Sequence, residues 1–228
     1  MNARWGNALS VLLGDCLFAQ ALNLSTNFNK AEISRSIAQA ARDVCSGEII
    51  QTQRRFDLHL AVEDYRRIVE MKTGSLFAVA AELSGVINEA DAAIVRALRQ
   101  FGLKIGTAYQ IYDDCLDIAG NESIIGKTLG TDLRKGKLTL PVLMLLRAAP
   151  AKEREQYSQM IVDGKVDEMT EVLKTEVAGA PLSESITAGQ TLIREAQHEL
   201  RVLAPGTYAD AMMQLGDALR DLLEQLRD

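Results

Sequence analysis

Apolar residues recur every three or four positions along most of the chain, which is the period of an amphipathic helix. The first apolar stripe covers about 8–19 and ends at the Asn-rich segment 23–29, and a second helix is expected over about 30–54. A third is expected to begin near Val62 and to continue, or restart, as far as Gly85. The pattern therefore predicts one helix after another.

The longest apolar segment predicts a helix that begins near Asn88, a good N-cap residue, and ends at Gly120. Its second half is apolar on nearly every side, so we expect it to be central and buried. Gly102 and Gly106 lie four residues apart and would let neighbouring helices approach closely. Helices are expected to resume at Pro141 and then over about 151–161, 164–178, 182–203 and 207–227.

The composition supports a helical fold. Hydrophobic residues make up 47% of the chain and are mostly aliphatic, whereas aromatic residues make up 5% and there are 4 Pro, fewer than a β-sandwich or barrel usually needs. We find no internal repeat or linker, so the sequence predicts a single all-α domain, a helical bundle, over residues 1–228. The net charge of −6 argues against a nucleic-acid partner, although a local basic cluster could still bind a phosphorylated ligand.

Cysteine usage and hydropathy indicate a cytoplasmic protein. The chain has 3 Cys with no CxxC or Cys/His spacing, so neither a disulfide framework nor a zinc site is expected. We expect no transmembrane segment, because charged residues such as Asp15, Glu82 and Lys104 interrupt the longest apolar runs. The N-terminus does not resemble a signal peptide.

Three aspartates lie close together near the end of the long buried helix: Asp113, Asp114 and Asp117. Each residue advances about 100° around a helix, so Asp113 lies about 40° and Asp114 about 60° from Asp117, with Gln110 at the edge of the same face. A solvated helix end would explain such a cluster, but the flanking apolar residues favour a bound cation, because buried like charges repel. With only oxygen ligands on offer, Mg²⁺ or Mn²⁺ is favoured.

The segment that follows, 121–141, is basic and rich in glycine. Its cations Lys127, Arg134, Lys135 and Lys137 could turn back toward the aspartates, and a metal with ammonium groups is what a diphosphate needs. An ordinary solvated loop is the alternative, and the neighbouring aspartates favour the diphosphate site. The fragment GKT in this segment is not a P-loop, because the upstream glycine and a preceding strand are missing.

At these positions the chain resembles the trans-isoprenyl diphosphate synthases, also called polyprenyl synthetases. The resemblance is strong over roughly residues 1–150 and loose over the C-terminal helices. It rests on segments in the family's order: Gly14-Asp15, GEIIQ at 47–51, Lys72-Thr73-Gly74, YQIYDDCLD at 109–117 and KTLGTDLRKGKLTLP at 127–141. The aspartates resemble the family's second aspartate-rich motif, and the last segment its lysine segment.

The resemblance implies the all-α isoprenoid synthase fold and a site with three groups of residues. These are Asp113 and Asp114 holding Mg²⁺ with Asp117 nearby through water; Lys72, Lys127 and Lys137 contacting the allylic diphosphate; and Thr73 and Gln110 beside the leaving oxygen. The implied reaction is ionisation of an allylic diphosphate, attack by the alkene of isopentenyl diphosphate and loss of a proton. Metals and lysines would stabilise the departing diphosphate, and apolar helices would exclude water.

The chain departs from the family at its beginning. The family's first aspartate-rich motif, which binds two further Mg²⁺ ions, and the adjacent arginine pair and upstream Gly-Lys-Arg segment have no counterpart in these 228 residues. The family pattern places that motif just upstream of Asn2-Ala3-Arg4, so the chain resembles the family's fold without its opening helices. Losing one positioned electrostatic group often costs about 10²–10³ in rate, so we expect little or no elongation by this chain alone.

Three interpretations follow: a shortened polyprenyl diphosphate synthase, a catalytic or regulatory subunit of a heteromeric prenyltransferase, or a non-catalytic module that binds diphosphate and Mg²⁺. The intact second motif speaks against the third, and the lysine segment matches elongating enzymes better than terpene cyclases. The apolar helices that would be uncovered lead us to expect a homodimer or a heteromer. The product length cannot be read, because the family sets it largely beside the missing motif.

Overall fold

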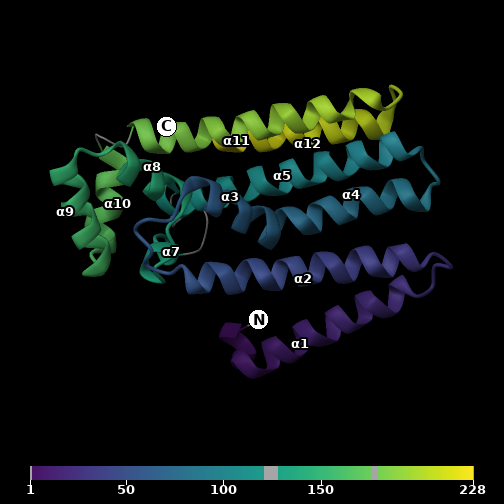
Figure 1. Cartoon of the computed structure of the whole chain (residues 1–228), viewed down its shortest axis with the longest axis horizontal. Coiled ribbons are helices and arrows are strands. Elements are labelled where there is room, and N and C mark those ends of the chain that lie inside the picture. Colours follow the sequence, from purple (N-terminus) through teal and green to yellow (C-terminus); the bar gives the residue numbers. More distant parts are fainter. Residues whose placement is uncertain (1, 121–127, 176–178, 228) are drawn as a thin grey trace. The chain divides into compact units, whose positions relative to one another are not determined.

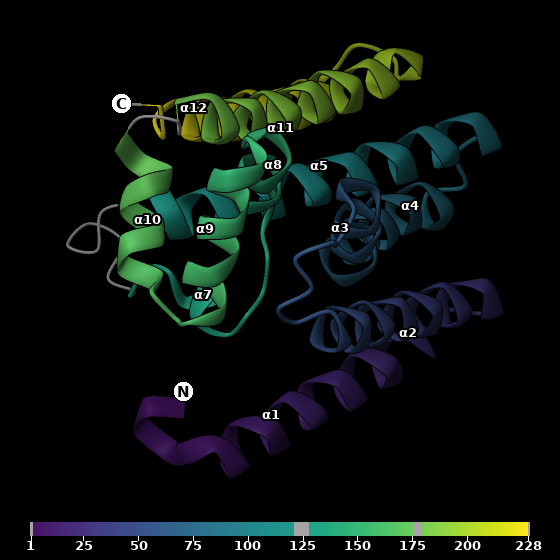
Figure 2. The same ribbon diagram turned by 60° about the vertical axis from the view of Figure 1, so that its left-hand side comes forward.

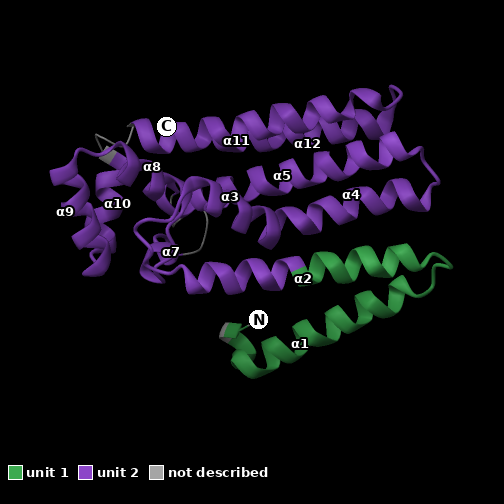
Figure 3. Cartoon of the chain, viewed as in Figure 1, with its two compact units in different colours: residues 1–42 green, residues 43–228 purple. Residues whose placement is uncertain are grey.

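The computed structural model describes residues 2–120, 128–175 and 179–227, and the regular secondary structure in these ranges is entirely helical (Figure 1). The predicted all-α fold class is therefore confirmed. The contacts divide the chain into two compact units, residues 1–42 and 43–228 (Figure 3). The single domain expected over 1–228 stays a prediction, and each unit is described by itself.

The first unit is a helical hairpin. Its first helix, α1 (Asn2–Ser25), is kinked at Gly6, whose φ of 78° and ψ of 171° are not helical. After a short turn, α2 (Ala31–Gln53) begins, and the hydroxyls of Ser25 and Ser34 are 2.9 Å apart across that turn. Many large apolar side chains of α1 are exposed: Trp5, Leu9, Val11, Leu12, Leu13, Leu17, Phe18 and Leu24.

The apolar character of α1 corrects one expectation. Within the described part of the chain, the 22-residue helical stretch Arg4–Ser25 contains an 18-residue window with a mean hydropathy of 1.4, which is long and apolar enough to cross a membrane. The expectation that charged residues interrupt every such run was wrong, because an 18-residue window that includes Asp15 still has this mean hydropathy. Length and composition do not distinguish such a helix from one that packs against further protein.

The second unit holds the end of α2 and the remaining helices. In chain order these are α3 (Val62–Val69), the π-helical turn η1 (Glu70–Gly74), α4 (Ser75–Ile87), α5 (Ala92–Ala119), α7 (Thr131–Arg134), α8 (Leu140–Ala148), α9 (Ala151–Val162), α10 (Val166–Thr175), α11 (Gly179–Glu199), the 3₁₀ turn η2 (Leu200–Val202) and α12 (Thr207–Glu224). Segments α3, η1 and α4 follow one another without a break. A π-helical turn within such a helix is often found at functional sites.

Helix α5 is the centre of this unit, as its sequence predicts. It packs against α4 on one side and α11 on the other (Figures 1 and 2). Its second half buries Ile105, Ala108, Ile111 and Cys115, each at most 4% exposed. Burial of these side chains together with those of α8 and α11 forms the hydrophobic core that fixes the position of α5.

Glycines set the spacing between α4 and α5. A Cβ placed on Gly102 would lie 2.7 Å from the carbonyl carbon of Phe77 and 2.9 Å from the Cα of Ala78. A Cβ placed on Gly106 would likewise lie 2.9 Å from the Cα of Gly74. The prediction that these glycines permit close helix contact is confirmed.

Two predicted helix ends differ from the structure. Asp91, not Asn88, precedes α5, and the side-chain amide of Asn88 instead donates to the carbonyl of Ser84 at the end of α4. Gly85 does not end α4, because it is a buried contact where a Cβ would lie 3.0 Å from a methyl group of Leu98. Both corrections have the same cause. Asn and Gly are common at helix ends, but each can also serve elsewhere, Asn88 in a hydrogen bond to the preceding helix and Gly85 in a close helix contact.

Candidate functional site

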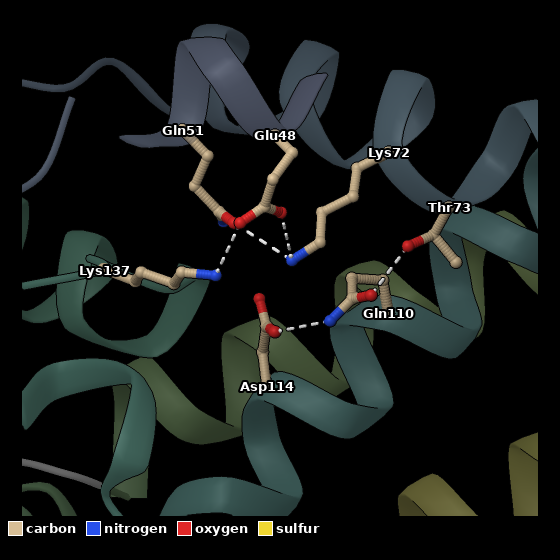
Figure 4. A network of polar contacts seen from close by, with 7 residues as sticks. All are labelled: Glu48, Gln51, Lys72, Thr73, Gln110, Asp114 and Lys137. Carbon is tan, nitrogen blue, oxygen red and sulfur yellow. Dashed lines mark hydrogen bonds and ion pairs between the residues drawn. The ribbon is translucent and has the colours of Figure 1, made fainter. Parts of the chain in front are cut away.

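The candidate site lies where α2, η1, α5 and the segment after α7 come together (Figure 4). From these four elements come Glu48 and Gln51, Lys72 and Thr73, Gln110 and Asp114, and Lys137. Local sequence spacing explains only pairs within one element. The packing of α2 and α5 against η1 brings the groups together.

A chain of polar contacts fixes Gln110 at the centre of this site. The hydroxyl of Thr73 donates to the Oε1 of Gln110 at 2.7 Å, and the Nε2 of Gln110 donates to Asp114 at 2.9 Å. The second contact spans one turn of α5, from residue i to residue i+4. Thr73 and Gln110, predicted to act together, are therefore adjacent, and both are only partly buried.

Asp114 is a buried carboxylate held from two sides. It is 4% exposed and also accepts a hydrogen bond of 2.6 Å from the hydroxyl of Tyr65 on α3. Burial raises the pKa of Asp114 to about 7, although the hydrogen bonds from Tyr65 and Gln110 lower it in part. A nearby cation would favour the charged form of such a group.

Asp117 faces a different neighbour. Its carboxylate accepts from the hydroxyl of Thr131 at 3.2 Å and from the backbone N–H of Asp132 at 3.1 Å, at the first turn of α7. Its own backbone carbonyl accepts from the N–H of Gly130 at 2.8 Å, and its side chain is 4% exposed. Asp117 thereby ties α7 to the end of α5, where a carboxylate complements the N-terminus of a helix.

Asp114 and Asp117 have different hydrogen-bond partners. Within residues 2–120, 128–175 and 179–227, no group of three or more His, Cys, Asp or Glu side chains lies close enough to hold a metal ion. Asp117 is engaged by α7, and the metal-ligand roles expected for Asp113, Asp114 and Asp117 stay a prediction. Asp113, which is half-buried, directly precedes Asp114 on α5.

The four predicted cations have different surroundings. The Nζ of Lys137 lies 3.3 Å from Glu48 and the side chain is only 12% exposed. Arg134 instead pairs with Asp167 on α10 at 2.6 Å, and Lys135 is exposed. Lys127 lies outside the described residues. Of the basic residues described in this segment, only Lys137 turns back toward the aspartate helix.

Four residues with no role assigned from sequence belong to the site: Glu48, Gln51, Tyr65 and Asp132. Lys72 donates to the Oε1 of Gln51 at 3.0 Å and lies 3.2 Å from Glu48. Asp132 is half-buried, and its pKa is raised by burial and by Asp117, against the opposing effect of Lys137 and Lys72. Glu48 and Gln51 lie in the GEIIQ segment, whose resemblance to the family was the available signal.

The Tyr65 contact yields a stability prediction. Replacing Tyr65 with phenylalanine is expected to lower the free energy of unfolding by about 1–3 kcal/mol, because Asp114 loses one of its donors in a buried place. Equilibrium unfolding in urea measures the change. Tyr208→Phe is the matched control, since the side chain of Tyr208 is 87% exposed and should show no effect. Equal stability of the two variants would contradict the importance of this hydrogen bond.

The fold is that of the isoprenoid synthases. A solved polyprenyl synthase from Caulobacter crescentus, complexed with calcium and isoprenyl diphosphate, superposes with a TM-score of 0.87 at 32% identity and covers 96% of this chain and 68% of its own. A decaprenyl diphosphate synthase from Rhodobacter capsulatus gives a TM-score of 0.84 at 29% identity, covering 100% of this chain and 70% of that one. These structures confirm the all-α isoprenoid synthase fold.

The family model described as "Polyprenyl synthetase" matches residues 1–176, and the chain therefore belongs to this family. An octaprenyl diphosphate synthase from Haemophilus influenzae is 30% identical over 94% of the chain and 65% of its own length. The "Heptaprenyl diphosphate synthase component 2" of Bacillus subtilis is 31% identical over 90% of the chain and 59% of its own length. The chain thus spans about 60–65% of these relatives. The resemblance found in the sequence is confirmed at the level of the family.

Proposed function

We propose that this chain is a trans-prenyltransferase, or a portion of one, that condenses isopentenyl diphosphate with an allylic diphosphate. The observation that carries the proposal is the meeting of Lys72 and Lys137 with Gln110, Thr73 and Asp114 at one place (Figure 4). Polyprenyl synthetase relatives with this activity support it. The proposed compartment is the cytoplasm.

The lysines would bind the allylic diphosphate. Lys72 and Lys137 belong to different elements, yet both contact the carboxylate of Glu48. The two ammonium groups are therefore close enough together for one diphosphate to bind both. In the proposed reaction the carbon–oxygen bond of the allylic diphosphate breaks and its electron pair leaves with the diphosphate. The alkene of isopentenyl diphosphate attacks the resulting cation, and a proton is then lost.

Thr73 and Gln110 would orient the leaving group. The amide of Gln110 is fixed at one end by the Thr73 hydroxyl and at the other by Asp114, which leaves it little rotational freedom. A pre-fixed amide needs no reorganisation when charge develops beside it. Phe77 lies one turn after Thr73, and Tyr109 directly precedes Gln110; their ring centroids are 5.9 Å apart. These two rings would face the hydrocarbon chain of the allylic substrate.

The residues present fit a magnesium ion shared with a ligand. Mg²⁺ commonly takes one or two carboxylates and completes its shell with water and phosphate oxygens. Asp113 and Asp114 supply that number, and the raised pKa of Asp114, caused by burial, is what a cation would reverse. When bound, Mg²⁺ or Mn²⁺ would neutralise charge on the departing diphosphate. Asp117 is proposed to act indirectly, by holding α7 and Asp132 in place.

Chain elongation by the 228-residue chain is expected to be weak. Only one aspartate-rich motif is present in these residues, so we expect a rate about 10²–10³ below that of a relative with both motifs. The test incubates the purified chain with Mg²⁺, isopentenyl diphosphate and farnesyl diphosphate, beside the Haemophilus influenzae octaprenyl diphosphate synthase as reference. Magnesium-dependent binding of farnesyl diphosphate with little product supports the proposal. Robust elongation would overturn the expected weakness, and no binding would overturn the function.

A role as one subunit of a heteromeric prenyltransferase is the second candidate. One relative is named as a component of a heptaprenyl diphosphate synthase, and the exposed apolar side chains of α1 would suit a protein neighbour. The two candidates differ in whether elongation requires another chain. Light scattering of the purified protein measures whether it forms a homodimer, and addition of a family member that carries the first motif tests whether activity then appears.

A further inference from the structure

Glu48 lies between the two lysines and has no part in the proposed reaction. Its Oε2 is 3.2 Å from the Nζ of Lys72 and its Oε1 is 3.3 Å from the Nζ of Lys137, so each oxygen meets a different lysine (Figure 4). The three side chains come from three separate elements. A single carboxylate therefore joins two cations that would otherwise repel each other.

The position of Glu48 is fixed by the residue before it. A Cβ on Gly47 would lie 2.8 Å from the backbone nitrogen of Lys72 and 3.2 Å from the carbonyl oxygen of Ile68. The backbone of α2 therefore lies directly against α3 and η1, and Glu48, the next residue, pairs with Lys72. The GEIIQ segment is thus arranged to bring a carboxylate to the site.

The contacts are those of an ion pair that can be exchanged. Desolvation raises the pKa of Glu48, but Lys72 and Lys137 together lower it by more than that. The net shift of the pKa is therefore downward, and the group is an anion at neutral pH. Its side chain is 46% exposed, whereas that of Lys137 is 12% exposed. The acid can turn toward solvent while the lysines stay in place, and Gln51 keeps its hydrogen bond to Lys72.

We propose that Glu48 is a resident anion that occupies Lys72 and Lys137 until a diphosphate group takes its place. The inference rests on the proposed function, because it takes these lysines to be ligands of a diphosphate. A diphosphate carries more charge and more oxygens than one carboxylate, so it displaces Glu48 while weaker anions do not. Glu48 thus competes for the two lysines and lowers their affinity for any anion that has to displace it.

The test measures binding of inorganic diphosphate to the full chain, without metal, by titration calorimetry. Glu48→Gln keeps the size of the side chain and removes its charge, and is expected to bind diphosphate about tenfold more tightly, because two partly exposed ion pairs no longer compete. A structural strut would predict the reverse, since its loss would weaken binding. Glu48→Ser is expected to show the same gain and serves if Glu48→Gln fails to fold.

Glu199→Gln is the matched control. Glu199, at the end of α11, pairs at 2.7 Å with Lys104, which lies on α5 but outside the site. This variant therefore makes the same change in net charge elsewhere and should bind diphosphate like the unaltered chain. Equal or weaker binding by both Glu48 variants would overturn the inference and leave the proposed function standing. If replacing both Lys72 and Lys137 with methionine leaves diphosphate binding unchanged, the proposed function fails and the inference with it.

Discussion

Replacing Gly102 with alanine is expected to lower the free energy of unfolding by about 2 kcal/mol. The added methyl group would lie 2.7 Å from the carbonyl carbon of Phe77 and 2.9 Å from the Cα of Ala78. Both are backbone atoms of α4, so no side chain can rotate to relieve the overlap and the two helices must separate. Overpacking costs typically about 1–3 kcal/mol and occasionally more, and contact with backbone atoms puts Gly102 at the high end of that range. The gain of about 1 kcal/mol in helix propensity offsets part of this cost.

Equilibrium unfolding in urea, followed by circular dichroism, measures this loss. Gly14→Ala is the matched control, because Gly14 is also helical and a Cβ there would meet nothing within 4 Å. Its stability should stay the same or rise by up to about 1 kcal/mol. A Gly102→Ala variant as stable as the Gly14→Ala variant would show that α4 and α5 do not need this close contact.

The helices were predictable because the apolar period acts locally, whereas their ends were less so. Residues Asn88 and Asp91 are both good N-cap residues, and the local sequence does not show which of them precedes the helix. The amide of Asn88 reaches the carbonyl of Ser84, which leaves Asp91 to precede α5. Likewise Gly85 looks like a helix terminator in sequence, but its small size serves the contact with Leu98.

The candidate site was predictable only in part, for a related reason. Spacing along α5 places Gln110 and Asp114 one turn apart, and the structure joins them at 2.9 Å. Spacing cannot show that Tyr65, 49 residues upstream of Asp114, donates to it, or that the carboxylate of Asp117 accepts from the backbone of α7. Contacts between distant segments depend on helix packing, so the sharing of Glu48 by two lysines became visible only in the folded chain.

The largest effect on ligand binding is expected from replacing both Lys72 and Lys137 with methionine. Each lysine would give a diphosphate a charge-assisted hydrogen bond, and such bonds contribute about 1.5–3 kcal/mol apiece. Losing both should weaken magnesium-dependent binding of farnesyl diphosphate at least about a hundredfold. Methionine keeps most of the length and apolar volume of lysine, so packing around η1 and α7 is largely retained.

Lys104→Met provides the control for this double variant, and a calorimetric titration with farnesyl diphosphate and Mg²⁺ provides the measurement. Lys104 is similarly sheltered, with a side chain 20% exposed and ion pairs to Glu199 and Glu195 on α11, but it lies outside the site. Its replacement removes one positive charge without touching the proposed ligand groups, so binding should not change. If Lys104→Met weakened binding as much as the double variant, the general charge of the chain would explain the affinity. A loss confined to Lys72 and Lys137 would instead place the diphosphate between η1 and the segment after α7.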